Sequence, residues 1–180
     1  MGLKKSLISF VDRATKATTT INYAHHEIHD GSHYYIKGYV ELDTDADIDF
    51  CITTPDSTKW GHMLFSISGT SITTIEIYEG STYSTAGSAV TAINNNRNST
   101  NTSVMSIASE RSITALGTKI SASKFGTATN PGNPLAGGSA AREDEVILKQ
   151  NTSYTFRIIS GADGNTIDYR ANWYEHTSKG

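Results

Sequence analysis

The sequence predicts an all-β protein: a single-domain β-sandwich of jelly-roll type, preceded by a short N-terminal arm. Three observations predict it. Apolar and polar residues alternate in many short segments, clusters of Gly, Pro, Asn, Asp and Ser separate these segments, and little of the chain has helical periodicity. The lack of a repeat of fixed length argues against a propeller or a solenoid.

The 180 residues fit one domain, which we expect to span residues 21–180. Before it, residues 1–20 are expected to form a separable arm. Apolar residues recur at helical spacing in this arm and predict a short amphipathic helix over residues 3–16. Consecutive β-branched threonines at 18–20 disfavour its continuation.

The first half of the sandwich domain contains segments in which every second residue is apolar, a pattern typical of strands with one buried face. The expected inward-facing sets run from Tyr34 to Leu42, from Ile48 to Ile52, from Met63 to Ile67 and from Ile75 to Ile77. Turn residues such as Pro55, Gly69 and Gly80 separate them.

The second half predicts further strands, with less regular spacing. They are expected at residues 104–107, 113–116, 154–158 and 167–174. Residues 126–141 are rich in Pro and Gly, so we expect a long loop there. Asp163-Gly164 predicts a tight hairpin that joins the last two strands.

Charge and apolar content argue against several functions. The net charge is −3 and the Lys and Arg residues are scattered, so a nucleic acid is not the expected partner. No apolar run approaches the roughly 20 residues of a membrane span, and the start lacks a secretory-signal pattern. We expect synthesis in a reducing cytosol. The single Cys51 excludes an intrachain disulfide and is expected to be a buried structural thiol.

A histidine-rich segment is the first candidate site. Its members are His25, His26, His29 and His33. On a helix three of them would share a face and could bind Zn²⁺, but Asp30-Gly31-Ser32 argues against that helix. In an extended chain His25, Glu27 and His29 would share a face instead. We expect a polar strand or arm that forms interface contacts, which would respond to pH because histidine titrates near neutrality.

A polar loop, Asn96-Arg97-Asn98-Ser99, is the second candidate site. Arg offers five donors in a rigid fork, and Asn offers both donors and acceptors. This composition suits a hydrogen-bonded contact with a protein or a sugar, and it also suits an ordinary solvated turn. Trp60 and Trp173 are expected to be core or interface anchors rather than sugar platforms.

The carboxylates and the known catalytic motifs indicate no reaction. Alternating acids over 43–49 could bind Ca²⁺ through oxygen, but the EF-hand spacing is lacking, and a solvated strand edge is the expected role. The sequence contains neither a G-x-S-x-G nucleophile elbow nor a phosphate-binding glycine loop. We therefore expect no enzymatic activity, no cofactor and no metal.

Several motifs in a fixed order resemble the capsid decoration (cement) proteins of tailed bacteriophages. The motifs are His25–His33, Tyr35–Val40, Thr54–Trp60, Ile77–Ser81, Asn94–Ser99, Gly137–Arg142, Glu145–Lys149 and Trp173–His176. The similarity covers residues 21–176, whereas the arm matches no pattern of that family.

The resemblance implies a β-sandwich subunit that forms a homotrimer and binds the major capsid protein on the outer surface of the assembled head, which it stabilises. It implies a virion location and no catalytic residues. The side chains expected at the subunit or capsid interface are His25, His26, His29, His33, Trp60, Asn96, Arg97, Asn98 and Arg142.

Two other functions fit the same fold. A receptor- or carbohydrate-binding module of a phage tail fibre or baseplate would share the sandwich and the polar loops, but no heptad or collagen-like segment supports a fibre. A hydrolase on a jelly-roll scaffold would need a cleft with converging acids, which nothing in the sequence requires.

Overall fold

The computed structural model describes residues 23–127, 136–138 and 145–177. The predicted arm over 1–20, with its helix over 3–16, lies outside the described residues, and so does Arg142.

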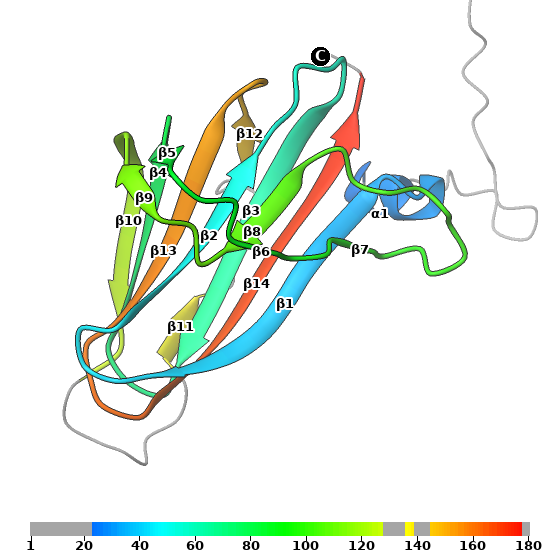
Figure 1. The fold of residues 1–180 in the computed structure, drawn as a ribbon. Coiled ribbons are helices and arrows are strands. Elements are labelled where there is room, and N and C mark those ends of the chain that lie inside the picture. The colour runs from blue at the N-terminus through cyan, green and yellow to red at the C-terminus, as the bar shows by residue number, and fades with distance from the viewer. Residues whose placement is uncertain (1–22, 128–135, 139–144, 178–180) are drawn as a thin grey trace, which may run out of the picture.

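The first of two main sheets contains the first and the last strand of the described chain. Its order is β11 (Ala136–Gly138), β3 (Trp60–Gly69), β14 (Asn165–His176), β1 (His33–Leu42) and β7 (Ile93–Asn94), and β12 (Val146–Leu148) also pairs with β3. The long central strands pair antiparallel over ten positions each. Figure 1 shows them running side by side from the helix to the opposite end of the molecule.

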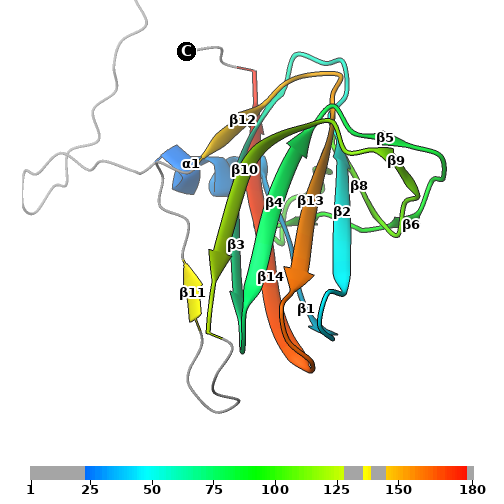
Figure 2. The same ribbon diagram turned by 90° about the vertical axis from the view of Figure 1, so that its left-hand side faces the viewer.

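The second sheet packs face to face with the first, as the rotated view shows (Figure 2). Its order is β10 (Thr118–Phe125), β4 (Thr73–Glu79), β13 (Ser153–Ser160), β2 (Asp47–Thr53), β8 (Ser106–Ser109) and β6 (Ser88–Ala89). A separate two-stranded ribbon pairs β5 (Thr82–Tyr83) with β9 (Ile113–Ala115). The predicted all-β sandwich is confirmed, and the jelly-roll connection order stays a prediction.

The core lies between the two sheets, as the alternation predicts. Ile52 and Ile158 of the second sheet and Ile167 and Trp173 of the first are fully buried. Trp173 is therefore a core anchor, as expected. Cys51 is also fully buried and carries a free thiol. Burial raises its pKa, which suits the expected structural role.

The predicted hairpin at Asp163-Gly164 is wrong, because β13 and β14 belong to opposite sheets. The fully buried Asn165 explains the crossing. Its Nδ2 donates to the carbonyl of Ile72 and to Ser160 Oγ at 3.0 and 3.2 Å, while its Oδ1 accepts from the Ser71 amide at 2.9 Å. These bonds hold the turn between β13 and β14 where the chain crosses from the second sheet to the first. The two strands therefore do not pair as a hairpin.

Several strands form where none was predicted, among them β10, β11 and β12. β10 is an edge strand whose side chains are almost all exposed, so it lacks the alternation that identifies half-buried strands. β11 lies within the loop expected over 126–141, and its backbone pairs with the end of β3.

The helix α1 (Tyr23–Asp30) corrects the expected extended conformation of the histidine-rich segment. The predicted break at Gly31 is nevertheless real. Gly31 has a φ of 70°, its amide donates to the carbonyl of Ile28, and the Ser32 amide donates to the carbonyl of Glu27. This is a Schellman motif, in which a left-handed glycine closes a helix. The sequence therefore indicated correctly where the helix ends. The prediction was wrong because it also excluded a helix over the residues before this stop.

Candidate interaction site at the helix end

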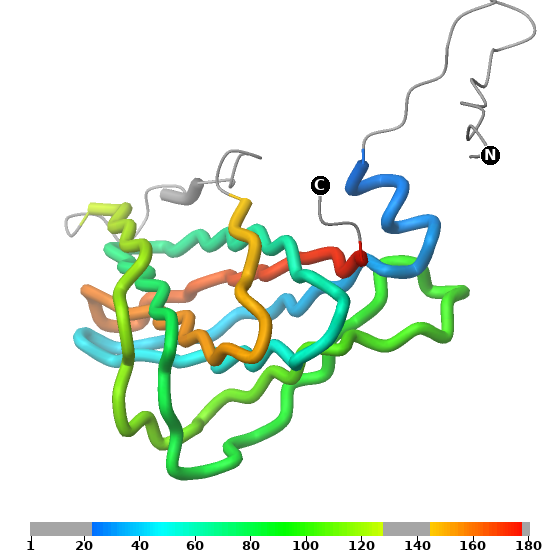
Figure 3. Tube along the Cα trace, turned by 90° about the horizontal axis from the view of Figure 1, so that it is seen from above, coloured from blue at the N-terminus to red at the C-terminus, as the bar shows by residue number. Residues whose placement is uncertain are grey.

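One end of the sandwich gathers most of the predicted interface residues. We call it the helix end: α1, the loop of residues 95–104, and the adjoining ends of β1, β3 and β14. Figure 3 shows the loop after β7 passing beside α1, where the end of β14 also arrives. Trp60 begins β3 at this end, opposite His176 of β14.

The asparagine-rich loop is bound directly to the C-terminus of α1. Asn96 Nδ2 donates to the carbonyl of His29 at 3.0 Å. Asn94 Nδ2 and Asn101 Nδ2 both donate to the carbonyl of Gly31, at 2.8 and 3.3 Å. Carbonyls at a helix C-terminus have no partner inside the helix, so these amides supply what the helix end requires. Two motifs that lie far apart in the sequence therefore form one surface.

Side chains also fix the loop internally. The amides of Asn96 and Asn98 donate to the side-chain oxygens two residues earlier, Asn94 Oδ1 at 2.8 Å and Asn96 Oδ1 at 3.1 Å. These are Asx turns, which hold a loop without a sheet. Arg97 and Asn98 are exposed on this framework, as the sequence predicted.

A buried carboxylate holds the base of the loop. Glu175 is 2% exposed. Its Oε1 accepts from Ser103 Oγ at 2.5 Å and from Trp173 Nε1 at 3.0 Å, and its Oε2 accepts from the Val104 amide at 3.0 Å. The carboxylate satisfies three donors and ties the loop to β14.

The four predicted histidines do not form a single cluster. His25 and His29 face each other on the exposed side of α1, with their Nε2 atoms 3.0 Å apart. His26 Nδ1 lies 3.5 Å from an Asp30 carboxylate oxygen. His33 instead begins β1 and is buried. Among the residues that the structure describes, no three His, Cys, Asp or Glu side chains are arranged to hold a metal ion.

A second histidine network, missed by the sequence analysis, lies beneath α1. His62 Nδ1 is 2.8 Å from Glu145 Oε1, and His62 Nε2 is 2.9 Å from His176 Nε2. Tyr174 Oη donates to Glu145 at 2.6 Å, and Tyr23 Oη of α1 lies 3.4 Å from His176 Nδ1. These residues are scattered through the sequence. Alternation on β3 and β14 could have placed His62 and Tyr174 on outward faces, but only the register brings them together.

One arrangement of protons satisfies the three contacts that run from Tyr23 through His176 and His62 to Glu145. Tyr23 then donates to His176 Nδ1, His176 Nε2–H donates to His62 Nε2, and His62 Nδ1–H donates to Glu145. Burial and the neighbouring His62 lower the pKa of His176 and favour its neutral form, although Glu27 and Glu145 act in the opposite direction. We call these residues the histidine relay.

A half-open pocket of about 160 Å³ lies beside the histidine relay. Its wall residues are Ala24, His33, His62, Leu64, Glu145, Asn172 and Tyr174. His33 is 6% exposed, and its Nδ1 is buried without a hydrogen-bond partner. Burial lowers the pKa of His33, and the Arg170 guanidinium lowers it further, so the imidazole is neutral near pH 7.

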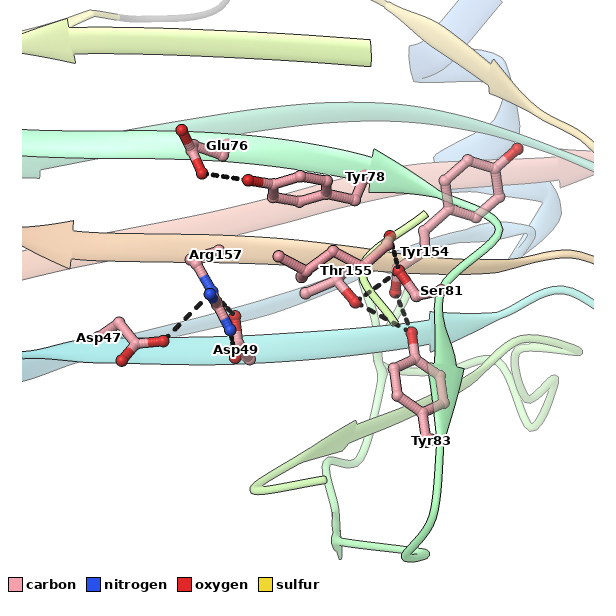
Figure 4. Close-up of polar contacts among 10 residues, drawn as sticks. Asp47, Asp49, Glu76, Tyr78, Ser81, Tyr83, Tyr154, Thr155 and Arg157 are labelled. Carbon is pink, nitrogen blue, oxygen red and sulfur yellow. Dashed lines mark hydrogen bonds and ion pairs between the residues drawn. The ribbon is translucent and has the colours of Figure 1, made fainter. Parts of the chain in front are cut away.

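The outer face of the second sheet carries a different polar network (Figure 4). Arg157 donates through Nε and Nη2 to the two carboxylate oxygens of Asp49, at 2.9 and 2.7 Å, and its Nε also lies 3.2 Å from Asp47. On β4, which neighbours the strand of Arg157, Tyr78 donates to Glu76 two residues earlier. Two of the acids that were expected at a solvated edge over 43–49 thus hold an arginine on the middle strand.

Comparison with known proteins gives no relative. Neither the family models, nor the curated proteins, nor the solved structures contain a match to this chain. In the described part of the chain, no helix combines the length and apolar character that crossing a bilayer requires.

Proposed function

We propose that this protein is a capsid decoration protein of a tailed bacteriophage. It binds the outer surface of the assembled head as a homotrimer, contacts the major capsid protein, and stabilises the shell in the virion. Its site is a protein-binding surface, and the helix end is the part that contacts the shell.

The supporting observation is the convergence of three motifs on the helix end. The histidine-rich segment 25–33, the asparagine-rich segment 94–99 and the final motif 173–176 are separate in the sequence and each enters the resemblance to decoration proteins. Direct hydrogen bonds join the first to the second, and Tyr23 and His176 join the helix to the third. A binding surface that is shared with a family would be expected to bring the family's motifs together in this way.

The physical character of the helix end suits the same role. Its loop is held by internal hydrogen bonds, so little side-chain entropy is lost when a partner binds. It presents the cation of Arg97 together with amides and imidazoles, which form hydrogen-bonded contacts of modest strength. A trimer multiplies such contacts through effective concentration, because each bound subunit holds the others near their sites.

Cosedimentation with undecorated heads of the cognate capsid protein tests the proposal. We expect saturable binding of the full chain and raised resistance of the heads to heat. Arg97→Ala should weaken binding about tenfold, the loss of one good charged contact. Lys124→Ala, an equally exposed change on β10 at the other sheet, is the matched control and should bind normally.

Two results would contradict the proposal. One is the absence of saturable binding to heads by the full chain. The other is binding to cell-surface glycan in place of heads, which would favour the receptor-binding module. Analytical ultracentrifugation of the purified protein tests the trimer separately.

A further inference from the structure

The exposed side of α1 carries a pair of histidines that the proposed function does not use. We propose that His25 and His29 together bind one divalent copper or nickel ion, with Nε2 of each ring as a ligand. No metal was expected here, because the segment was predicted to be extended. Four residues of extended chain span roughly 13 Å. The helix instead brings the two Nε2 atoms to 3.0 Å.

The distance between the two nitrogens suits neighbouring positions around one metal ion. At a metal–imidazole distance of about 2.0–2.1 Å, nitrogens that lie 3.0 Å apart subtend an angle of about 90° at the ion. A right angle separates neighbouring ligands in the tetragonal coordination that Cu²⁺ and Ni²⁺ adopt. The tetrahedral coordination of Zn²⁺ needs a wider angle. The separation therefore favours copper and nickel over zinc.

The two rings are already tilted with respect to the line between these nitrogens. Their centroids lie 4.7 Å apart and their planes meet at 72°, which is closer than a head-on contact of two ring nitrogens would place them. In the hydrogen bond between His25 and His29, one Nε2 donates a proton and the other accepts it. A metal ion can replace that shared proton when both rings carry a proton on Nδ1 instead.

The pair lies on the side of α1 that points away from the sandwich. On the opposite side Glu27 is buried, and the Tyr23 ring packs edge to face against Tyr174. A shift of two residues turns the helix by about 200°, and His25 and His29 are both exposed. Within the described part of the chain, no third His, Cys, Asp or Glu is arranged to join them. Water can therefore complete the coordination of the ion.

The backbone that carries the pair is held in place before an ion arrives. Asn96 Nδ2 donates to the carbonyl of His29 at 3.0 Å, and Asn101 Nδ2 donates to the carbonyl of Gly31 at 3.3 Å. A helix of eight residues is not stable alone, so these bonds are needed to keep the last turn formed. Binding then orders only two side chains, which limits its entropic cost. His29 also lies in this last turn, where the helix dipole favours a cation.

Two other histidine contacts at the helix end are less suited to a metal ion. His26 Nδ1 lies 3.5 Å from an Asp30 carboxylate oxygen, so this pair offers a single imidazole. His62 and His176 bring their Nε2 atoms to 2.9 Å, but His62 Nδ1 is bonded to Glu145 and the side chain of His62 is only 12% exposed. The exposed His26 is therefore the matched control for the pair.

Calorimetric titration of the full chain with Cu²⁺, Ni²⁺ and Mg²⁺ tests the site. We expect saturable binding of one copper or nickel ion per chain, tighter for copper, and no binding of Mg²⁺, which prefers oxygen ligands. His25→Gln and His29→Gln each leave a single imidazole and should weaken copper binding about tenfold or more. His26→Gln keeps both ligands and should bind as the parent does. Unchanged affinity in His25→Gln, or an equal loss in His26→Gln, would overturn the inference.

Two measurements on the parent chain test the same site without a variant. Electron paramagnetic resonance of the copper-loaded chain should show two coordinated imidazole nitrogens, and a single one or none would overturn the inference. Only the helical form brings the two ligands together, so nickel should stabilise that form by mass action. We therefore expect slower amide exchange in α1, with no change in β13. Unchanged exchange of α1 at saturating nickel would also overturn the inference, and neither measurement depends on the decoration role.

Discussion

The helix end and the outer face of the second sheet are both polar surfaces over a sheet, but different groups hold them. On the second sheet the Arg157 guanidinium, which stays protonated near neutral pH, donates to two carboxylates. At the helix end, imidazoles and phenols pass hydrogen bonds to a carboxylate. The first surface tolerates a change of pH, and the second depends on which protons are present.

The difference also separates rigid from adaptable chemistry. A bidentate arginine–carboxylate pair fixes both geometry and charge, and the Asp49 carboxylate raises the pKa of Arg157 still further. The geometry of the histidine relay instead depends on which imidazole nitrogens carry protons. A binding surface that must release its partner or change its arrangement is more easily built from histidines, whose charge changes near neutral pH.

The largest expected effect concerns Glu175, which supports the helix end from within. Glu175→Ala leaves Trp173 Nε1 and the Val104 amide without their acceptor, so we expect a loss of about 3 kcal/mol in unfolding free energy. Urea denaturation measures it. Glu175→Gln retains the shape and one acceptor and should lose less. A change in Glu175→Ala below about 0.5 kcal/mol would contradict the role assigned to this carboxylate.

The next effect concerns the second sheet. Arg157→Met removes the shared cation and leaves Asp47 and Asp49 facing each other, so we expect a loss of about 1–2 kcal/mol in unfolding free energy. The loss should be the same at pH 5.5 and pH 7.5. Lys149→Met breaks a much more exposed pair with Glu79 and should change stability by less than about 0.5 kcal/mol. Equal losses in the two variants would show that burial is not what distinguishes these pairs.

Acidification should weaken the helix end selectively. The pKa of His176 lies below its ordinary value of 6.5 in the folded state, so the unfolded chain binds more protons between the two values. Its stabilising contribution is therefore complete above pH 6.5 and is lost as the pH falls toward the folded-state pKa. His33 acts in the same direction.

Hydrogen exchange of the α1 and β13 amides at pH 7.5 and 5.5 measures this effect, after correction for intrinsic exchange rates. We expect α1 to lose protection at pH 5.5 while β13, beside Arg157, keeps it. His176→Gln should remove part of the difference. An equal loss of protection in α1 and β13 would contradict the proposed difference between the two surfaces.

The smallest effect concerns the link between α1 and the histidine relay. Tyr23→Phe removes the long hydrogen bond to His176 and the hydroxyl's hydrogen bond with Glu27, but it keeps the ring, whose centroid lies 5.7 Å from that of Tyr174. We expect a loss of about 0.5 kcal/mol in α1 protection, read by the same exchange measurement. Tyr39→Phe, on an exposed tyrosine of β1, should have no effect on α1.

The sequence predicted the parts of the fold that depend on alternation. Strands with one buried face, such as β1, β3 and β13, carry their inward residues at every second position, and Trp173 was identified as an anchor. β10 was missed because an exposed edge strand has no buried face to mark. The hairpin at Asp163-Gly164 was wrong because a turn signal specifies a local bend, whereas Asn165 decides between one sheet and two.

The candidate site was predicted in part. The exposed loop around Arg97 and the helix stop at Gly31 could be predicted because both depend on local backbone chemistry. The helix before that stop was missed, since its polar composition hides the stabilising contacts with β14. The histidine relay could not be predicted, because it joins His62, Glu145 and His176 through strand register, a property of the whole sheet.

Gly31, which ends α1, lies so close to the loop of residues 95–104 that the two segments constrain each other sterically. A β-carbon added at Gly31 would lie 2.3 Å from Ser99 Oγ, besides straining the backbone. No larger residue fits there unless the neighbouring loop retreats. We therefore expect α1 and the loop to change together among descendants of this protein. A new binding preference should arise when both segments are replaced as a unit.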